Sequence, residues 1–174
     1  APNALHAQMT IDAAKAGETI TVGAMSQRLA DATYVLGKNN GEEFITVMTG
    51  GGRGSLNAVV AHDVDMAWSV GAQTASVKSG DVTNLASAET APLKMQPDAP
   101  QIQDFNLPYD FGVKFLVAAP AGLPEEARAA WQDNIAAILN DPESKLHQFT
   151  QRVFSGPVVV QGADLEALMQ ESYD

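Results

Sequence analysis

The first half of the chain alternates between strand-like and helix-like hydrophobic patterns. Ile20 and Val22 alternate with polar neighbours in 18–24, which predicts a β-strand. The same reasoning predicts further strands at 43–48, 64–69 and 82–87. The segments between them have helical periodicity, and the predicted helices lie within 26–41, 55–63 and 71–80. In the first of these helices, one face carries Leu29, Ala32, Thr33 and Leu36, and Asn40 and Gly41 mark the end.

The alternation of strands and helices breaks at 90–108. This segment carries four prolines, which predict a long ordered loop or a boundary between lobes. Further on, strands are predicted at 111–120 and 157–161. Pro124 and two glutamates suit the first turn of a helix that aligns Ala127, Trp131, Ile135 and Ile138. Asp141 and Pro142 are expected to cap and open the next helix, with Leu146, Phe149 and Val153, and the closing helix carries Leu165, Leu168 and Met169.

Strands and helices that follow one another through short links are typical of an α/β fold. Such a chain forms a mainly parallel sheet with helices on both faces. Large apolar side chains are expected in its core, among them Trp68, Trp131, Met48 and Met66.

Charge and composition narrow the possible partners. Ten Lys and Arg residues stand against 21 Asp and Glu residues, and the net charge of -11 disfavours nucleic acid and anionic lipid. With no cysteine, the chain has neither disulfides nor thiolate chemistry, and cysteine usage does not indicate the compartment. No apolar run approaches the roughly 20 residues that span a bilayer. The start at Ala1 fits a mature form from which an export signal has been removed.

The most unusual stretch is the glycine run Gly50–Gly52 followed by Arg53, between a predicted strand and a predicted helix. Glycines let an anion approach backbone amides, and the positive end of a helix dipole favours a carboxylate or phosphate. The alternative is a tight turn with a solvated arginine. The run matches neither the phosphate-binding P-loop nor the dinucleotide fingerprint, so no cofactor is expected.

Catalytic and metal chemistry find little support in the sequence. His62, Asp63 and Asp65 lie close together in the chain but do not form a metal-binding motif, and turn or cap roles are expected for them. Ser26, Ser55 and Ser69 follow predicted strands, yet no nucleophile elbow surrounds any of them. An α/β enzyme that uses the glycine turn as an oxyanion or phosphate cradle remains an alternative.

Several motifs, taken in order, resemble a known family. The run 44–86 contains four motifs in order. They are the triple glycine, the segment His62-Asp63-Val64-Asp65 that leads into a predicted strand, the turn Lys78-Ser79-Gly80, and Leu85-Ala86 in the next predicted strand. The run resembles the central signature of the periplasmic solute-binding receptors of tripartite tricarboxylate transporters. Other segments are similar to the parts of that family's sequences that precede or follow the central signature, namely 13–27, 97–106, 115–131 and 140–149. Two departures are Gln101 in place of a usual Thr, and Ala24, Met25 and Ser26 in place of a Ser-Gly-Ser-rich loop.

The resemblance implies a two-lobed periplasmic binding-protein fold. Residues 1–108 would form the family's second lobe with its Pro-rich connecting loop, and 109–174 the C-terminal return segment of the first lobe. Most of the first lobe, including its Pro-Gly-Gly turn, has no counterpart in this sequence. The chain is therefore expected to be a fragment, or a variant whose missing lobe is provided elsewhere.

The resemblance also implies a function without catalysis. The protein would capture a small organic carboxylate in the periplasm and deliver it to the permease subunits of a membrane transporter. Carried over by position, the ligand-binding residues are Ala24, Met25 and Ser26, then Thr49, Gly50, Gly51, Gly52 and Arg53, and then Ser69, Val70 and Gly71. A sensing or partner-binding domain without a transport role would use the same residues, and the sequence leaves this alternative open.

Overall fold

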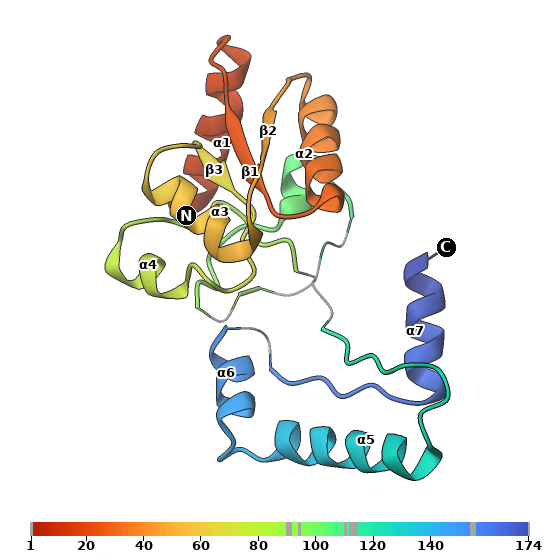
Figure 1. Cartoon of the computed structure of the whole chain (residues 1–174). Helices are drawn as coiled ribbons and strands as arrows, with labels where there is room; N and C mark the ends of the chain where they lie inside the picture. Colours follow the sequence, from red (N-terminus) through yellow and green to blue (C-terminus); the bar gives the residue numbers. More distant parts are fainter. Residues whose placement is uncertain are drawn as a thin grey trace. The chain divides into compact units, whose positions relative to one another are not determined.

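The computed structural model describes residues 2–89, 92–93, 95–109, 111, 115–153 and 156–173 (Figure 1). Two compact units divide the chain, Ala1–Val113 and Lys114–Asp174, here called unit 1 and unit 2. The predicted α/β class is confirmed, with a parallel sheet and helices packed on it in unit 1.

Unit 1 is built on a small parallel sheet in the order β2-β1-β3, with β1 at Thr21–Ala24, β2 at Ile45–Met48 and β3 at Met66–Ala67. Its helices are α1 (Pro2–Lys15), α2 (Gln27–Asn40), α3 (Gly51–Val60), α4 (Thr74–Ser79) and a short 3-10 helix, η1 (Ile102–Phe105). Neighbouring residues of a strand point to opposite faces. Val22 packs with α1 and α2, whereas a side chain at Gly23 would meet Thr49 and Val64, which flank α3. Helices therefore cover both faces of the central strand.

The amphipathic pattern of α2 is confirmed. Leu29, Ala32, Thr33 and Leu36 are all buried. Ser26 caps the N-terminus by accepting a hydrogen bond from the Leu29 N–H, and Gly41, with φ of 77°, provides the left-handed C-cap. Buried Thr33 in turn accepts a hydrogen bond from the indole of Trp68 at 2.9 Å, and this tryptophan, expected in the core, is only partly buried.

The core of unit 1 gathers residues that lie far apart in the sequence. Side chains from α1, β1, α2 and η1 form one cluster, and Leu107 is fully buried in the same cluster. The helix α1 was not predicted from the sequence. It ends at Lys15, and Gly17 follows it with φ of 93°.

Four predictions in unit 1 need correction. The helix predicted at 55–63 begins at Gly51, so the glycines form its first turn instead of a preceding loop. The strand predicted at 64–69 is reduced to Met66–Ala67. No strand forms at 82–87, where one parallel bridge joins Ser87 to Gln101. Met48 was expected in the core but is 57% exposed, since it is the last residue of β2, a strand at the edge of the sheet.

Unit 2 contains α5 (Glu125–Asn140), α6 (Lys145–Val153) and α7 (Ala163–Tyr173). The strands predicted at 111–120 and 157–161 are wrong for the described residues, because 115–120 and 157–161 are irregular. Asp141 ends α5, and the cap of α6 is Ser144, whose hydroxyl accepts a hydrogen bond from the His147 N–H at 3.0 Å. None of the described side chains of unit 2 is buried. Trp131, expected in the core, is 63% exposed.

Candidate functional site

The predicted ligand-binding residues lie in three loops at one edge of the sheet, and the second loop, as named here, includes the first turn of α3. Because β1, β2 and β3 are parallel, the segments after Ala24, Met48 and Ala67 leave the sheet on the same side. They come together at Gly52. A methyl group built on Gly52 would lie 3.2 Å from Cγ2 of Val70 and 3.7 Å from Cε of Met25. The structure therefore brings the first, second and third loops into one cluster.

The second loop leads into α3 with little side-chain cover. Gly50 occupies the N-cap position without a side-chain hydrogen bond, and Gly51 has φ of 75°, a conformation that favours glycine. A Cβ at either residue would meet no atom within 4 Å. The Cβ sides of Gly50 and Gly51 therefore border open space, so no side chain would obstruct an approaching anion there, while the Gly51 N–H itself donates to the Thr49 carbonyl at 3.0 Å.

Charges in the first helical turns differ from helix to helix. The first turns of α2, α3 and α6 contain no acidic residue, whereas those of α5 and α7 carry Glu125, Glu126, Asp164 and Glu166. An acidic side chain normally stabilises the positive end of a helix dipole. The N-termini of α2 and α3 therefore carry no acidic side chain in their own first turns.

Arg53 is an exposed residue of the first turn of α3. Among the described residues it makes no ion pair, and a cation at this end of a helix is electrostatically unfavourable without a nearby anion. Arg128, near the start of α5, differs because its guanidinium binds the Glu125 carboxylate at 2.6 Å. The two arginines are therefore a matched pair, one with and one without an acidic partner.

The serines of the three loops are engaged by neighbours other than histidine. Ser26 caps α2, buried Ser55 lies 2.5 Å from the Thr49 hydroxyl, and Ser69 donates to Gln73 at 2.7 Å. His62 is exposed, with φ of 60°, in the turn that follows α3. In the described part of the chain, no serine and histidine form a nucleophile and base pair, and no cluster of acidic and histidine side chains could hold a metal ion.

The third loop is held by a hydrogen-bonded series of amides that the sequence analysis missed. Gln73 accepts hydrogen bonds from the Ser69 hydroxyl at 2.7 Å and the Gly71 N–H at 2.9 Å. Its own amide donates to Asn84 at 3.4 Å, and Asn84 donates to Gln96 at 2.8 Å. These residues are separated by about a dozen positions and follow no motif, so no sequence pattern indicates the network.

Asp65 has a structural role at the opposite edge of the sheet. Its carboxylate accepts hydrogen bonds from the Thr21 hydroxyl and the Thr21 N–H, each at 2.7 Å. These bonds favour the charged form and hold the pKa of the Asp65 carboxyl below its usual range. The contact fastens the start of β1 to the residue before β3.

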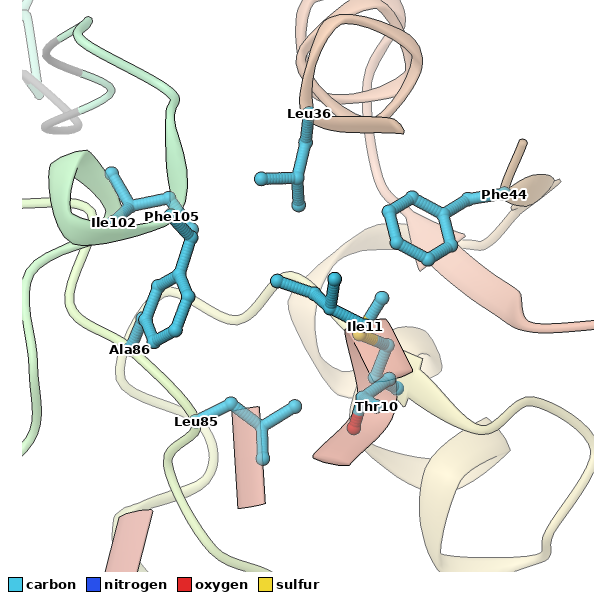
Figure 2. A pocket seen from close by; sticks show the side chains of 9 residues that line it. Thr10, Ile11, Leu36, Phe44, Leu85, Ala86, Ile102 and Phe105 are labelled. Carbon is cyan, nitrogen blue, oxygen red and sulfur yellow. The ribbon is translucent and has the colours of Figure 1, made fainter. Parts of the chain in front are cut away.

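A cavity of about 50 Å³ lies away from the three loops, within the core of unit 1 (Figure 2). Figure 2 shows side chains from α1, α2 and η1 around it, and its lining is Thr10, Ile11, Leu36, Phe44, Met66, Leu85, Ala86, Ile102 and Phe105. The lining is almost entirely apolar and offers no charged group. A cavity of this kind stays dry and does not suit a carboxylate.

None of the helices within the described residues is both long and apolar enough to cross a membrane.

No protein-family model and no curated protein matches the chain. Solved structures do. A periplasmic transporter is 16% identical, with a TM-score of 0.82 over 96% of this chain and 57% of that one. A TctC solute-binding protein from Polaromonas, solved without ligand, is 18% identical, with a TM-score of 0.65 over 95% of this chain and 58% of that one.

The chain thus spans a little under three fifths of the length of each of these proteins. At such low identity, the likeness extends to the fold. The chain has the α/β fold of periplasmic solute-binding proteins over nearly its whole length.

Proposed function

We propose that the three loops of unit 1 bind a small organic carboxylate, and that the chain serves as all or part of a periplasmic solute-binding receptor. The observation that carries this proposal is the meeting of the loops at Gly52, where Met25 and Val70 approach from the two flanking loops. Binding at the ends of parallel strands is the usual arrangement in open α/β sheets.

The electrostatics of the loops support an anionic ligand. With a net charge of -11, the protein repels anions at long range and can hold one only through local donors. The first turn of α3, which has no side-chain cap, and Arg53, which makes no ion pair with any described residue, supply such donors. Ala24, Ser26, Thr49, Ser69 and Gly71 complete the proposed site. The donors suit a carboxylate because its two oxygens can accept hydrogen bonds from amides and a guanidinium together.

Delivery to the permease subunits of a membrane transporter is the transport role proposed for this receptor. The names of the two similar structures, a periplasmic transporter and a TctC solute-binding protein, support it. A carboxylate sensor without transport partners would share the site. Uptake of the bound acid in a strain that lacks the protein distinguishes the two roles. Loss of a transport receptor should reduce uptake, whereas loss of a sensor should leave the transporter itself working.

Unit 2 is proposed to be the C-terminal return segment of a first lobe. Phe115, Val117 and Val158 are between 72% and 80% exposed in segments whose sequences favour strands. Apolar strand-forming segments of this kind are suited to pairing within a larger sheet. The similar structures are long enough to contain such a sheet, since about two fifths of each has no counterpart here.

Thermal unfolding with a panel of mono-, di- and tricarboxylates tests the proposal. An acid present at 100 times its dissociation constant should stabilise the fold by about 2.7 kcal/mol and raise the unfolding temperature. Chloride and sulfate at equal ionic strength are the controls. If every carboxylate shifts the transition no more than these salts do, the loops do not bind carboxylates and the proposal fails.

A further inference from the structure

The hydrogen bonds of the third loop have a direction that the backbone determines. A backbone N–H can only donate, so the Gln73 atom 2.9 Å from the Gly71 nitrogen must be the carbonyl oxygen. That oxygen can only accept. The Ser69 hydroxyl, 2.7 Å from the same oxygen, must therefore direct its proton to Gln73.

The rest of the amide series keeps Gln73 in this orientation. Its nitrogen faces Asn84 Oδ1 at 3.4 Å, and the Asn84 nitrogen donates to Gln96 at 2.8 Å. Asn84 is only 8% exposed, so turning its amide round would leave buried polar atoms without partners. The protons of Ser69 and Gly71 are thus committed to Gln73.

The loops consequently offer different chemistry to a ligand. Ser69 retains only lone pairs and can act towards a ligand as a hydrogen-bond acceptor. Ser26 is the reverse case, because its oxygen accepts from the Leu29 N–H at 3.4 Å while its proton has no acceptor among the described residues. Donors therefore gather on the first and second loops, and the third loop supplies an acceptor.

We infer that the bound acid carries a hydrogen-bond donor, a hydroxyl or ammonium group, which meets the Ser69 oxygen while the carboxylate faces the other two loops. The inference rests on the proposed function and narrows its ligand class to hydroxy or amino acids. A carbonyl in the donor's place would set two acceptors against each other. A methylene would leave the Ser69 oxygen without a partner, which costs binding energy.

Calorimetric titration with two series of acids tests this inference. Lactate, propionate and pyruvate differ only at the second carbon, as hydroxyl, methylene and carbonyl, and malate, succinate and oxaloacetate repeat the comparison for dicarboxylates. In the series that binds, the preferred enantiomer of the hydroxy acid should bind roughly tenfold more tightly than the methylene acid, the effect of one hydrogen bond. The oxo acid should bind no more tightly than the methylene acid.

Two variants separate specificity from structure. Ser69→Ala should reduce the affinity for the hydroxy acid to that for the methylene acid, whose own affinity should not fall, because the variant has no serine oxygen left without a partner. Ser79→Ala is the control, since its hydroxyl contacts Asp81 at the end of α4 and lies outside the proposed site. Gln73→Leu releases the protons of Ser69 and Gly71, so the oxo acid should gain affinity relative to the hydroxy acid.

The outcomes distinguish this inference from the proposed function. Equal affinities of the hydroxy and methylene acids would overturn the inference and leave carboxylate binding intact. Loss of methylene-acid binding in Ser69→Ala would also overturn it, because the serine would then act only as structural support. Failure of all the acids to bind would refute the proposed function, and the inference with it. If Gln73→Leu does not fold, the Ser69→Ala comparison decides.

Discussion

Replacing Gly52 with alanine should weaken ligand binding while changing the stability of the fold little. Gly52 is the second residue of α3, and its new methyl group would lie 3.2 Å from Val70 Cγ2, with Met25 Cε at 3.7 Å and Met25 Sδ at 3.8 Å. Cγ2 of Val70 and Cε of Met25 end their side chains; the flexible methionine adjusts at small cost, and Val70 must move by a few tenths of an ångström. Alanine gains about 0.5–1 kcal/mol over glycine within a helix, so the free energy of unfolding should change by less than about 1 kcal/mol.

Binding should respond much more strongly to the same substitution. The methyl group would fill the point where the three loops meet and keep an anion from the amides of α3. We expect carboxylate affinity to fall about tenfold or more, equivalent to about 1.4 kcal/mol or more. Urea denaturation measures the stability change, and calorimetric titration with the tightest acid of the panel measures the binding change.

Gly54 provides the matched control in the same helix. A Cβ there would meet only Thr49 atoms at 3.9 Å and 4.0 Å, so Gly54→Ala should be neutral or stabilising and should bind the acid normally. Equal affinity of Gly52→Ala and the unmodified protein would refute the placement of the site at Gly52. A loss of more than about 2 kcal/mol of stability in Gly52→Ala would show that Val70 and Met25 cannot yield.

Two further predictions concern charged side chains. Arg53→Ala should weaken carboxylate binding about tenfold with the fold retained. Arg128→Ala is the control, because it removes an arginine already paired with Glu125 and should leave binding unchanged. Equal effects of the two substitutions on affinity would contradict a specific role for Arg53. Because its folded-state pKa lies below the ordinary value, the Asp65 carboxylate should contribute stability that is fully present above about pH 5 and is lost as the pH falls below about 4. The contribution should be about 1 kcal/mol or less, because the side chain is exposed. In urea titrations, Asp65→Asn should have a lower free energy of unfolding than the unmodified protein at pH 6, and this difference should shrink at pH 3. A difference that does not change with pH would contradict the linkage.

Local patterns in the sequence predict part of this fold correctly. They succeed for elements whose position and ends depend on residues within the element itself. The buried face of α2 follows from its period of 3.6 residues, and its ends follow from Ser26 and Gly41. The loops after β1, β2 and β3 could be placed at one sheet edge because parallel strands require it. That the loops meet at Gly52 depends on packing between distant segments, which no sequence pattern displays.

The incorrect strand predictions have a common physical cause. The segments 82–87, 115–120 and 157–161 have sequences suited to a sheet, but a strand forms only when a neighbour supplies its hydrogen bonds. The same reasoning applies to Trp131, since apolar periodicity marks a face suited to burial and does not provide the covering surface. The Gln73 network was missed because it depends on side chains that the fold brings together.

The most direct test of the central claim is a backbone NMR titration of the chain with its tightest carboxylate. The largest amide shifts should fall in Met25–Ser26, Gly50–Arg53 and Ser69–Gly71, which come from three separate parts of the sequence. Amides near Ile11, Phe44 and Phe105, around the apolar cavity, should move little. Shifts concentrated around the cavity or in unit 2, with the three loops unchanged, would contradict carboxylate binding at the three loops.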